Sequence, residues 1–227
     1  MIQELSHGKL IAGAIPVGGL HLVPQDKFEL LNFGLAARGP VRSVALFSRI
    51  AFDAFSSQST VRITTESVSS VRLLSLLWKM RTHHPGIPTL ATPEDTPDGE
   101  LLIGNAALIR QRHGNDQFIT DLSQRWFINT QLPFVFARWV MASTINPQQK
   151  NDIHSWLSEI DARREELLQQ TAYEPNNLMP PQEILSYLKH ISWKLGPEEE
   201  AGQHHFLNTW KQLGNEPVFQ ERSYKNI

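Results

Sequence analysis

The stretch Asp121 to Met141 reads DLSQRWFINTQLPFVFARWVM, and it predicts how the rest of the chain is arranged. Its first part is amphipathic and predicts a short helix from about Leu122 to Asn129. Its last part, Phe134 to Met141, is apolar apart from Arg138 and predicts one buried strand. Pro133 suits the first position of that strand, where sheet pairing needs no N–H group. A strand that is apolar on both faces is usually central in an α/β sheet, so we interpret this segment as the return from one lobe to another.

Size and composition narrow the class of protein. The chain has 227 residues, enough for one large or two small domains, and its 41% hydrophobic residues allow a packed core. The net charge of −2, without a Lys/Arg block, argues against a nucleic-acid or membrane-surface partner. The absence of cysteine excludes thiol catalysis, disulfides and thiolate metal sites. With neither a signal-peptide pattern nor an apolar run of about 20 residues, we expect a cytoplasmic protein.

The first two thirds of the chain carry the strand patterns, and the last third carries helices. Short apolar or alternating runs predict strands at Leu10 to Val17, Val44 to Phe47, Thr60 to Thr65 and Leu101 to Ile103, the last ended by Gly104. Helical spacing is expected around Val71 to Trp78, after Asn146-Pro147, after Pro180-Pro181 as far as Ile191, and from Glu198 onward. We therefore predict an α/β chain whose helical tail braces its start.

Three places could bind or transform a ligand. Thr64 to Ser70 joins a strand to a helix start, where free N–H groups and hydroxyls suit a carboxylate or phosphate, although plain helix capping explains the serines equally well. Ser43 follows the Gly39-Pro40 turn and could point into a cleft, but the residues alone favour an ordinary serine at a strand edge. Asn105 follows a strand end and could either bind a ligand or cap the next helix.

Other conspicuous residues point to structure rather than chemistry. The pairs His83-His84 and His204-His205 lack a suitably spaced third ligand, so we expect no metal site. Trp78, Trp156 and Trp210 fall on apolar helical faces and are expected in the core, and Glu198 to Glu200 are expected to be a solvated first turn. No phosphate-binding glycine motif is present, so nothing supports nucleotide binding.

Several segments together resemble the chorismate dehydratase of the futalosine route to menaquinone. They are RGPVRSVALFS (Arg38 to Ser48), TTESVSSVRLL (Thr64 to Leu74), LLIGNAAL (Leu101 to Leu108), DLSQRW with LPFVFARW (Asp121 to Trp139), and YLKHISWKLGPEEEAGQHHF (Tyr187 to Phe206). They follow the family's order, cover most of the chain, and are most specific at LPFVFA. The resemblance implies a two-lobed α/β fold similar to a type II periplasmic binding protein.

The resemblance also implies site residues and a reaction. Ser43 corresponds to the family's serine and is the catalytic candidate. The candidates for substrate binding are Ser69, Ser70, Asn105, Gly104 and Pro16. The implied reaction is dehydration of chorismate to 3-[(1-carboxyvinyl)oxy]benzoate by a carbon–oxygen lyase that needs no cofactor or metal. The expected partner is this small dicarboxylate, with neither nucleic acid nor membrane, and the protein is expected to be a monomer or homodimer.

The chain departs from the family pattern at three places. Asn105 and Ile11 stand where the family has aspartates, and the family's first strand, helix and strand, with an asparagine in the first turn, have no counterpart before Gly8. The start is interpreted either as a late start codon or as a degenerate copy. Because a missing central strand exposes sheet edges, we expect this exact chain to be poorly stable or inactive alone.

The expected architecture is therefore two-lobed. Residues 1–40 and 134–227 form the first lobe, and residues 41–133 form the second, with the ligand between them. The alternatives are a non-catalytic small-anion solute-binding protein of the same fold and the sister 1,4-dihydroxy-6-naphthoate synthase.

Overall fold

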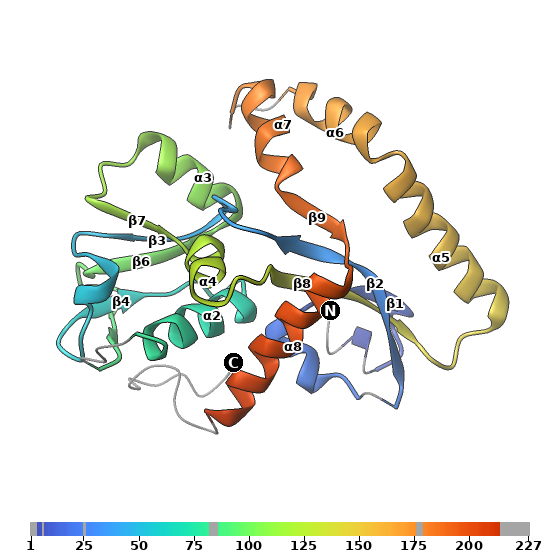
Figure 1. The fold of residues 1–227 in the computed structure, drawn as a ribbon, viewed down its shortest axis with the longest axis horizontal. Helices are drawn as coiled ribbons and strands as arrows, with labels where there is room; N and C mark the ends of the chain where they lie inside the picture. The colour runs from blue at the N-terminus through green and yellow to red at the C-terminus, as the bar shows by residue number, and fades with distance from the viewer. Residues whose placement is uncertain (1–3, 6, 25, 82–85, 176–178, 214–227) are drawn as a thin grey trace.

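The computed structural model describes residues 4, 5, 7–24, 26–81, 86–175 and 179–213. Strands and short helices occupy its first two thirds, and helices with one further strand occupy the last third (Figure 1). In chain order the elements are β1 (Ala12–Pro16), the 3-10 helix η1 (Val17–Leu22), β2 (Phe28–Ala37), β3 (Val44–Ser48), the 3-10 helix η2 (Phe52–Ala54), β4 (Thr60–Arg62), α2 (Val68–Lys79), β5 (Thr89–Leu90), β6 (Gly99–Ile103), α3 (Gly104–His113), β7 (Phe118–Asp121), α4 (Leu122–Thr130), β8 (Phe134–Ala142), α5 (Pro147–Ala162), α6 (Arg164–Tyr173), α7 (Pro181–Lys189), β9 (Ile191–Lys194) and α8 (Pro197–Gln212).

The expected helix and strand around Pro133 are both present. The helix α4 is capped by Asp121 and ends at Gln131, which takes a left-handed conformation with φ 58°. The strand β8 is central in a four-stranded sheet of order β1-β8-β2-β9, here called sheet 1, and it runs antiparallel to both neighbours. Its alternate residues pack on α8 and on α5, which explains its nearly unbroken apolar sequence.

A second sheet is built from the middle of the chain. Sheet 2 has the order β5-β4-β6-β3-β7, and all five residues of β3 are buried in its interior. The strand β3 is antiparallel to β6 and β7, whereas β4 is parallel to β6. The start of β3 and the ends of β4, β6 and β7 therefore meet at one edge of sheet 2.

The two sheets lie side by side, and the chain crosses between them twice. Figure 1 shows β2 leading from sheet 1 toward β3, and β8 leading back after α4. Sheet 1 takes its strands from residues 12–37, 134–142 and 191–194, and sheet 2 takes its strands from residues 44–121. The lobe boundaries at residues 40 and 133 stay a prediction.

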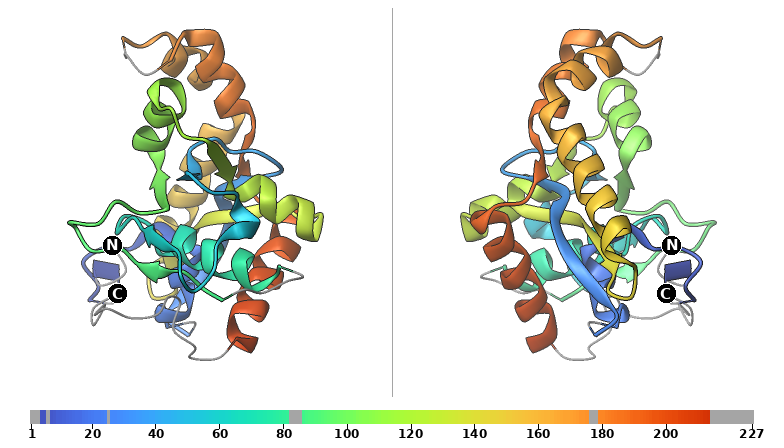
Figure 2. Two further views of the ribbon diagram at one scale, coloured as in Figure 1. Left: turned by 90° about the vertical axis from the view of Figure 1, so that its left-hand side faces the viewer. Right: turned by 90° about the vertical axis from the view of Figure 1, so that its right-hand side faces the viewer.

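Helices cover both faces of sheet 1. Figure 2 shows α5 along its outer side, and α8 crosses the other side, where Phe206 packs against Trp126 and Phe134 with ring centroids 6.2 and 5.1 Å away. Beside sheet 2, Trp78 of α2 is fully buried against Phe52 and Phe55. No helix among the described residues is long and apolar enough to cross a membrane.

Two local predictions are corrected and one is confirmed. The helix expected to continue to Ile191 ends at Lys189, because residues 191–194 pair with β2 as the edge strand β9. The strand β6 ends before Gly104 as expected, and the φ of 57° at Gly104 turns the chain directly into α3. Trp156 is 51% exposed and not part of the core: its ring meets Trp139 edge to face and leaves much of its surface to solvent.

Candidate active site at the edge between the sheets

Ser43 and the start of α3 lie together at the edge of sheet 2. Val44 pairs with Ile103, and the Gly104 N–H donates to the Ser43 carbonyl at 2.7 Å. Gly104 and Asn105 are exposed, and α3 has no side-chain cap. Because the first N–H groups of a helix lack intrahelical acceptors, this helix start can receive an anion beside Ser43.

Ser43 is held in a specific backbone conformation, but its hydroxyl is free. The side chain is only 7% exposed, and its Oγ has no hydrogen-bond partner among the described residues. The preceding residue, Arg42, has φ 62°, a conformation that residues other than glycine rarely adopt. Such strained positions cluster at functional sites, where the surrounding structure enforces them.

Asp121 enforces the conformation before Ser43. Its Oδ2 accepts the N–H groups of Val41 and Arg42 at 2.9 and 2.5 Å, and its Oδ1 accepts the N–H of Gln124 at 3.0 Å. From the other side, the Gln111 Nε2 donates to the Arg42 carbonyl at 2.9 Å. Burial raises the pKa of Asp121, although the backbone N–H groups act against the shift by favouring the carboxylate. Two elements therefore fix the backbone that leads into Ser43.

The sequence analysis missed this role of Asp121 and Gln111. The position of Asp121 before an amphipathic helix indicated a helix cap, and that signal was correct. Asp121 also accepts the N–H groups of Val41 and Arg42, which lie 79–80 residues earlier in the chain, so no local pattern could reveal these bonds.

The serines at the start of α2 are engaged within the protein. Ser67 caps the helix by accepting the Ser70 N–H at 3.1 Å, and the Ser67 and Ser70 hydroxyls contact each other at 2.9 Å. The Ser69 hydroxyl accepts the Gly18 N–H at 2.9 Å and donates to the Phe136 carbonyl at 3.0 Å. Ser69 and Ser70 are each 1% exposed, so their hydroxyls join elements of the fold instead of facing a ligand freely.

Pro16 lies on the opposite side of this junction, in sheet 1. It pairs with Ala137, next to the carbonyl that receives the Ser69 hydroxyl. The start of α2 also lies close to η1, because a Cβ on Gly18 of η1 would come within 2.9 Å of the Ser69 Cα. The structure thus brings Ser43, Gly104 and Asn105 into one group and Pro16 and Ser69 into another, and both groups lie at the junction between the two sheets.

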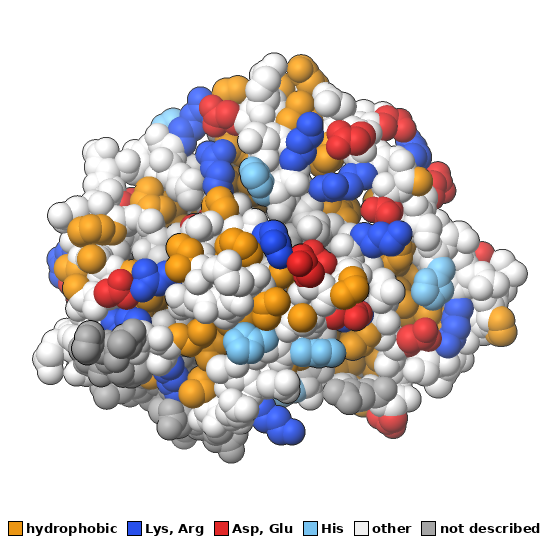
Figure 3. Space-filling view, in the orientation of Figure 1, with side chains coloured by type: hydrophobic (Ala, Val, Ile, Leu, Met, Phe, Trp, Pro, Cys, Tyr) orange, Lys and Arg blue, Asp and Glu red, His pale blue; other side chains and the backbone are white. Residues whose placement is uncertain are grey.

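Figure 3 shows positive and negative side chains interspersed over the face in view, without a broad area of one sign. Within the described ranges, no group of three or more His, Cys, Asp or Glu residues could hold a metal ion. His83 and His84 lie outside the described residues.

The three glutamates in the first turn of α8 are not simply solvated. Glu198, Glu199 and Glu200 bind Arg38, the Gly196 N–H and Arg138, respectively.

Solved structures confirm the expected fold class. Protein AF1704 from Archaeoglobus fulgidus has a TM-score of 0.62 at 14% identity, over 93% of this chain and 82% of that one. The periplasmic aliphatic sulphonate binding protein SsuA from Escherichia coli has a TM-score of 0.61 at 16% identity, over 100% of this chain and 85% of that one. The chain therefore has a periplasmic-binding-protein-like α/β fold.

A sequence relative and a family model show the family to which the chain belongs. A chorismate dehydratase of Thermus thermophilus is 34% identical over an aligned length of 171, which covers 65% of this chain. The match spans 59% of that relative's length. A family model described as menaquinone biosynthesis matches residues 2–212, and so this chain belongs to the menaquinone biosynthesis family.

Proposed function

We propose that this protein is a chorismate dehydratase, a carbon–oxygen lyase that forms 3-[(1-carboxyvinyl)oxy]benzoate. The observation that carries the proposal is its 34% identity to a chorismate dehydratase, within a menaquinone biosynthesis family that matches nearly the whole chain. The free hydroxyl of Ser43 beside an uncapped helix start supports it. The lobe boundaries, a cytoplasmic location and a monomeric or dimeric state stay predictions.

The reaction removes one molecule of water from the substrate ring. A ring C–H bond and the neighbouring C–OH bond break, and the proton and hydroxide leave together as water while the ring becomes aromatic. Because aromatisation drives the step, the protein needs chiefly to orient a dicarboxylate and to carry a proton. Helix N–H groups and one hydroxyl are sufficient for these tasks.

Each candidate residue has a proposed role. Ser43 carries the proton, and the N–H of Asn105 at the start of α3 binds one substrate carboxylate. The Gly104 N–H is already bonded to the Ser43 carbonyl, so Gly104 contributes the turn that opens this helix start. Near Pro16, the first N–H groups of α2, including that of Ser69, bind the other carboxylate, while the Ser69 and Ser70 hydroxyls hold this helix in place. Asp121 is a positioning residue that acts through the backbone before Ser43.

The proposal is tested by incubating the purified chain with chorismate and identifying the product by mass spectrometry. We expect a product smaller than chorismate by one water molecule, and Ser43→Ala should lower turnover by about 10²-fold or more. The melting temperature should stay unchanged, because the Ser43 hydroxyl has no partner to lose.

Ser48→Ala is the matched control on the same strand. Ser48 is also buried, but its hydroxyl donates to the Ile50 carbonyl at 2.8 Å. This variant should lose about 1 kcal/mol of stability and keep its turnover. Chorismate binding without turnover would instead indicate a solute-binding protein, and turnover of only the cyclic futalosine substrate would indicate the sister synthase.

A further inference from the structure

A cavity lies away from the junction between the sheets, on the outer side of sheet 1. It occupies about 230 Å³ between the strands β2, β8 and β9 and the helices α5, α6 and α7. A cavity of about 150 Å³ is enough to hold benzene. The space is therefore large enough for a compound with one or two rings.

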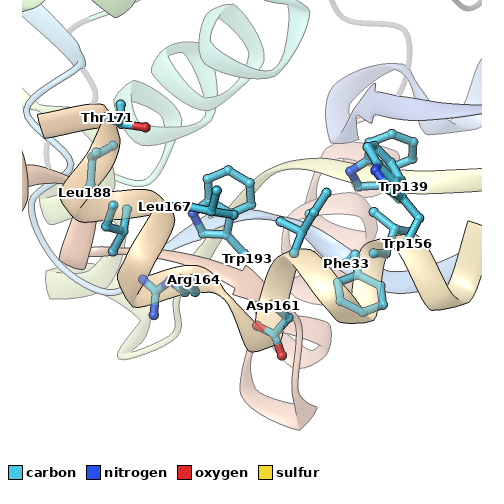
Figure 4. Close-up of a pocket in the computed structure, with 13 residues that line it drawn as sticks. Phe33, Trp139, Trp156, Asp161, Arg164, Leu167, Thr171, Leu188 and Trp193 are labelled. Atoms are coloured by element: carbon cyan, nitrogen blue, oxygen red, sulfur yellow. The ribbon is translucent and has the colours of Figure 1, made fainter. Parts of the chain in front are cut away.

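The walls of this cavity are mainly aromatic. Trp139 and Trp156 meet edge to face with ring centroids 5.6 Å apart, and Phe33 and Trp193 line the space beside them. Figure 4 shows Trp139 and Trp156 at one end and Arg164 toward the other, near Trp193 and Leu167. Such flat apolar walls favour a planar ring by burial and by edge or face contacts.

Arg164 gives the cavity a polar and positively charged end. Its Nη2 donates to the Ile191 carbonyl at 2.8 Å, but its Nη1 has no hydrogen-bond partner among the described residues. Its Nε–H is unpaired as well, but this atom has almost no accessible surface, so Nη1 is the donor that a ligand can reach. A charged donor without a partner on an apolar cavity indicates an acceptor that comes from outside the chain.

The neighbouring charges favour an anion as that acceptor. Asp161 also lines the cavity, but its carboxylate lies 3.7 Å from the Lys194 ammonium. The three groups together carry one net positive charge. We propose that this cavity binds a flat aromatic compound with one anionic group, an aryl carboxylate or sulfonate, with the ring against Trp139, Trp156 and Trp193 and the anion on Arg164.

The test uses the full chain, with 2-naphthoate as the probe and the neutral 2-naphthylmethanol as its partner of equal shape. Isothermal titration calorimetry should show saturable binding of 2-naphthoate, about tenfold tighter than that of the alcohol, because a charge-assisted hydrogen bond is stronger than a neutral one. Arg164→Gln should remove this preference. The control Arg163→Gln should keep it, because the neighbouring Arg163 is exposed and binds Glu159 and Glu166 instead.

A second variant and a competition experiment separate this cavity from the candidate active site. Leu167→Trp should fill the cavity and abolish binding of both probes, with circular dichroism and the melting curve confirming that the variant folds. Ser43→Ala and saturating chorismate should leave 2-naphthoate binding unchanged, so the result does not depend on the dehydratase activity. Absent binding, equal affinity for the two probes, an unaltered preference in Arg164→Gln, or displacement by chorismate would each overturn the proposal.

Discussion

Asp121 shows how much one buried carboxylate controls at this site. It accepts three backbone N–H groups and holds Arg42 in its left-handed conformation. Asp121→Ala should lower the free energy of unfolding by about 2–4 kcal/mol, since three N–H groups lose a charged acceptor. The proposed turnover should fall at least about tenfold, mainly in kcat, because Ser43 is no longer held in place.

Urea unfolding and chorismate kinetics measure these two effects of Asp121→Ala. The matched control is Asp152→Ala on α5, where the exposed carboxylate accepts a hydrogen bond from the Gln148 side chain and from no other described side chain. If Asp121→Ala were as stable and as active as this control, Asp121 would have no positioning role.

At the scale of elements, Ser69 joins α2 to η1 and β8 through one hydroxyl. Ser69→Ala leaves the buried N–H of Gly18 and the carbonyl of Phe136 without this partner. We expect a loss of about 1–3 kcal/mol in the free energy of unfolding, measured in urea. The KM for chorismate should change less than threefold if the Ser69 hydroxyl is structural. A large rise in KM with unchanged stability would show that the hydroxyl binds the substrate directly.

Asp98 links β4 to β6 and should make the stability of sheet 2 depend on pH. Burial acts to raise the pKa of Asp98, but the Thr60 N–H and the Arg49 guanidinium together hold it below its usual value. Because the folded state binds this proton less readily than the unfolded state, Asp98 stabilises the fold above about pH 4. That contribution is lost as the pH falls through the lowered pKa.

The measurement compares Asp98→Asn with the unchanged chain in urea from pH 7 to pH 3. At pH 7 the variant should be about 1–2 kcal/mol less stable, and the difference should shrink as the pH falls below 4. The raised pKa of Asp121 has the opposite effect on stability, because the fold loses stability as that group ionises. Both proteins contain Asp121, so its effect cancels in the difference between their free energies of unfolding. A difference that stayed constant with pH would contradict the role of Asp98.

At the scale of the whole molecule, a buried arginine ties sheet 1 to the helix α8. Arg138 is 4% exposed and donates to the Leu31 carbonyl and the Glu200 carboxylate, both at 2.9 Å. Arg138→Met should cost about 2–4 kcal/mol, because it leaves buried acceptors and a partly buried carboxylate unpaired. Arg38→Met removes the exposed ion pair with Glu198 on the same helix and should cost less than about 1 kcal/mol. Equal losses in urea unfolding would show that burial does not set the strength of these pairs.

Local patterns were sufficient for most helices and for several strands, although they did not predict β2, which lies inside sheet 1, or β7. The helix α4, the strand β8, the wholly buried strand β3 and the cap of α5 at Asn146 all follow from periodicity and capping residues within a few positions of one another. Ser43 and Asn105 were named from the sequence, and the structure places them at the same sheet edge. Their catalytic and binding roles remain predictions.

The sequence by itself determined most of the helices and the strands β1, β3, β4, β6 and β8, because capping residues and hydrophobic periodicity lie close together in the chain. The two-lobed α/β fold was implied by the family resemblance. Only the tertiary structure decided that residues 191–194 form a strand, that Ser69 bonds to Gly18 and Phe136, that Asp121 holds Arg42, and that Arg164 lies on an aromatic cavity. Each of these features joins side chains or backbones that are distant in sequence. Their positions depend on how all the elements pack together, which no local pattern contains.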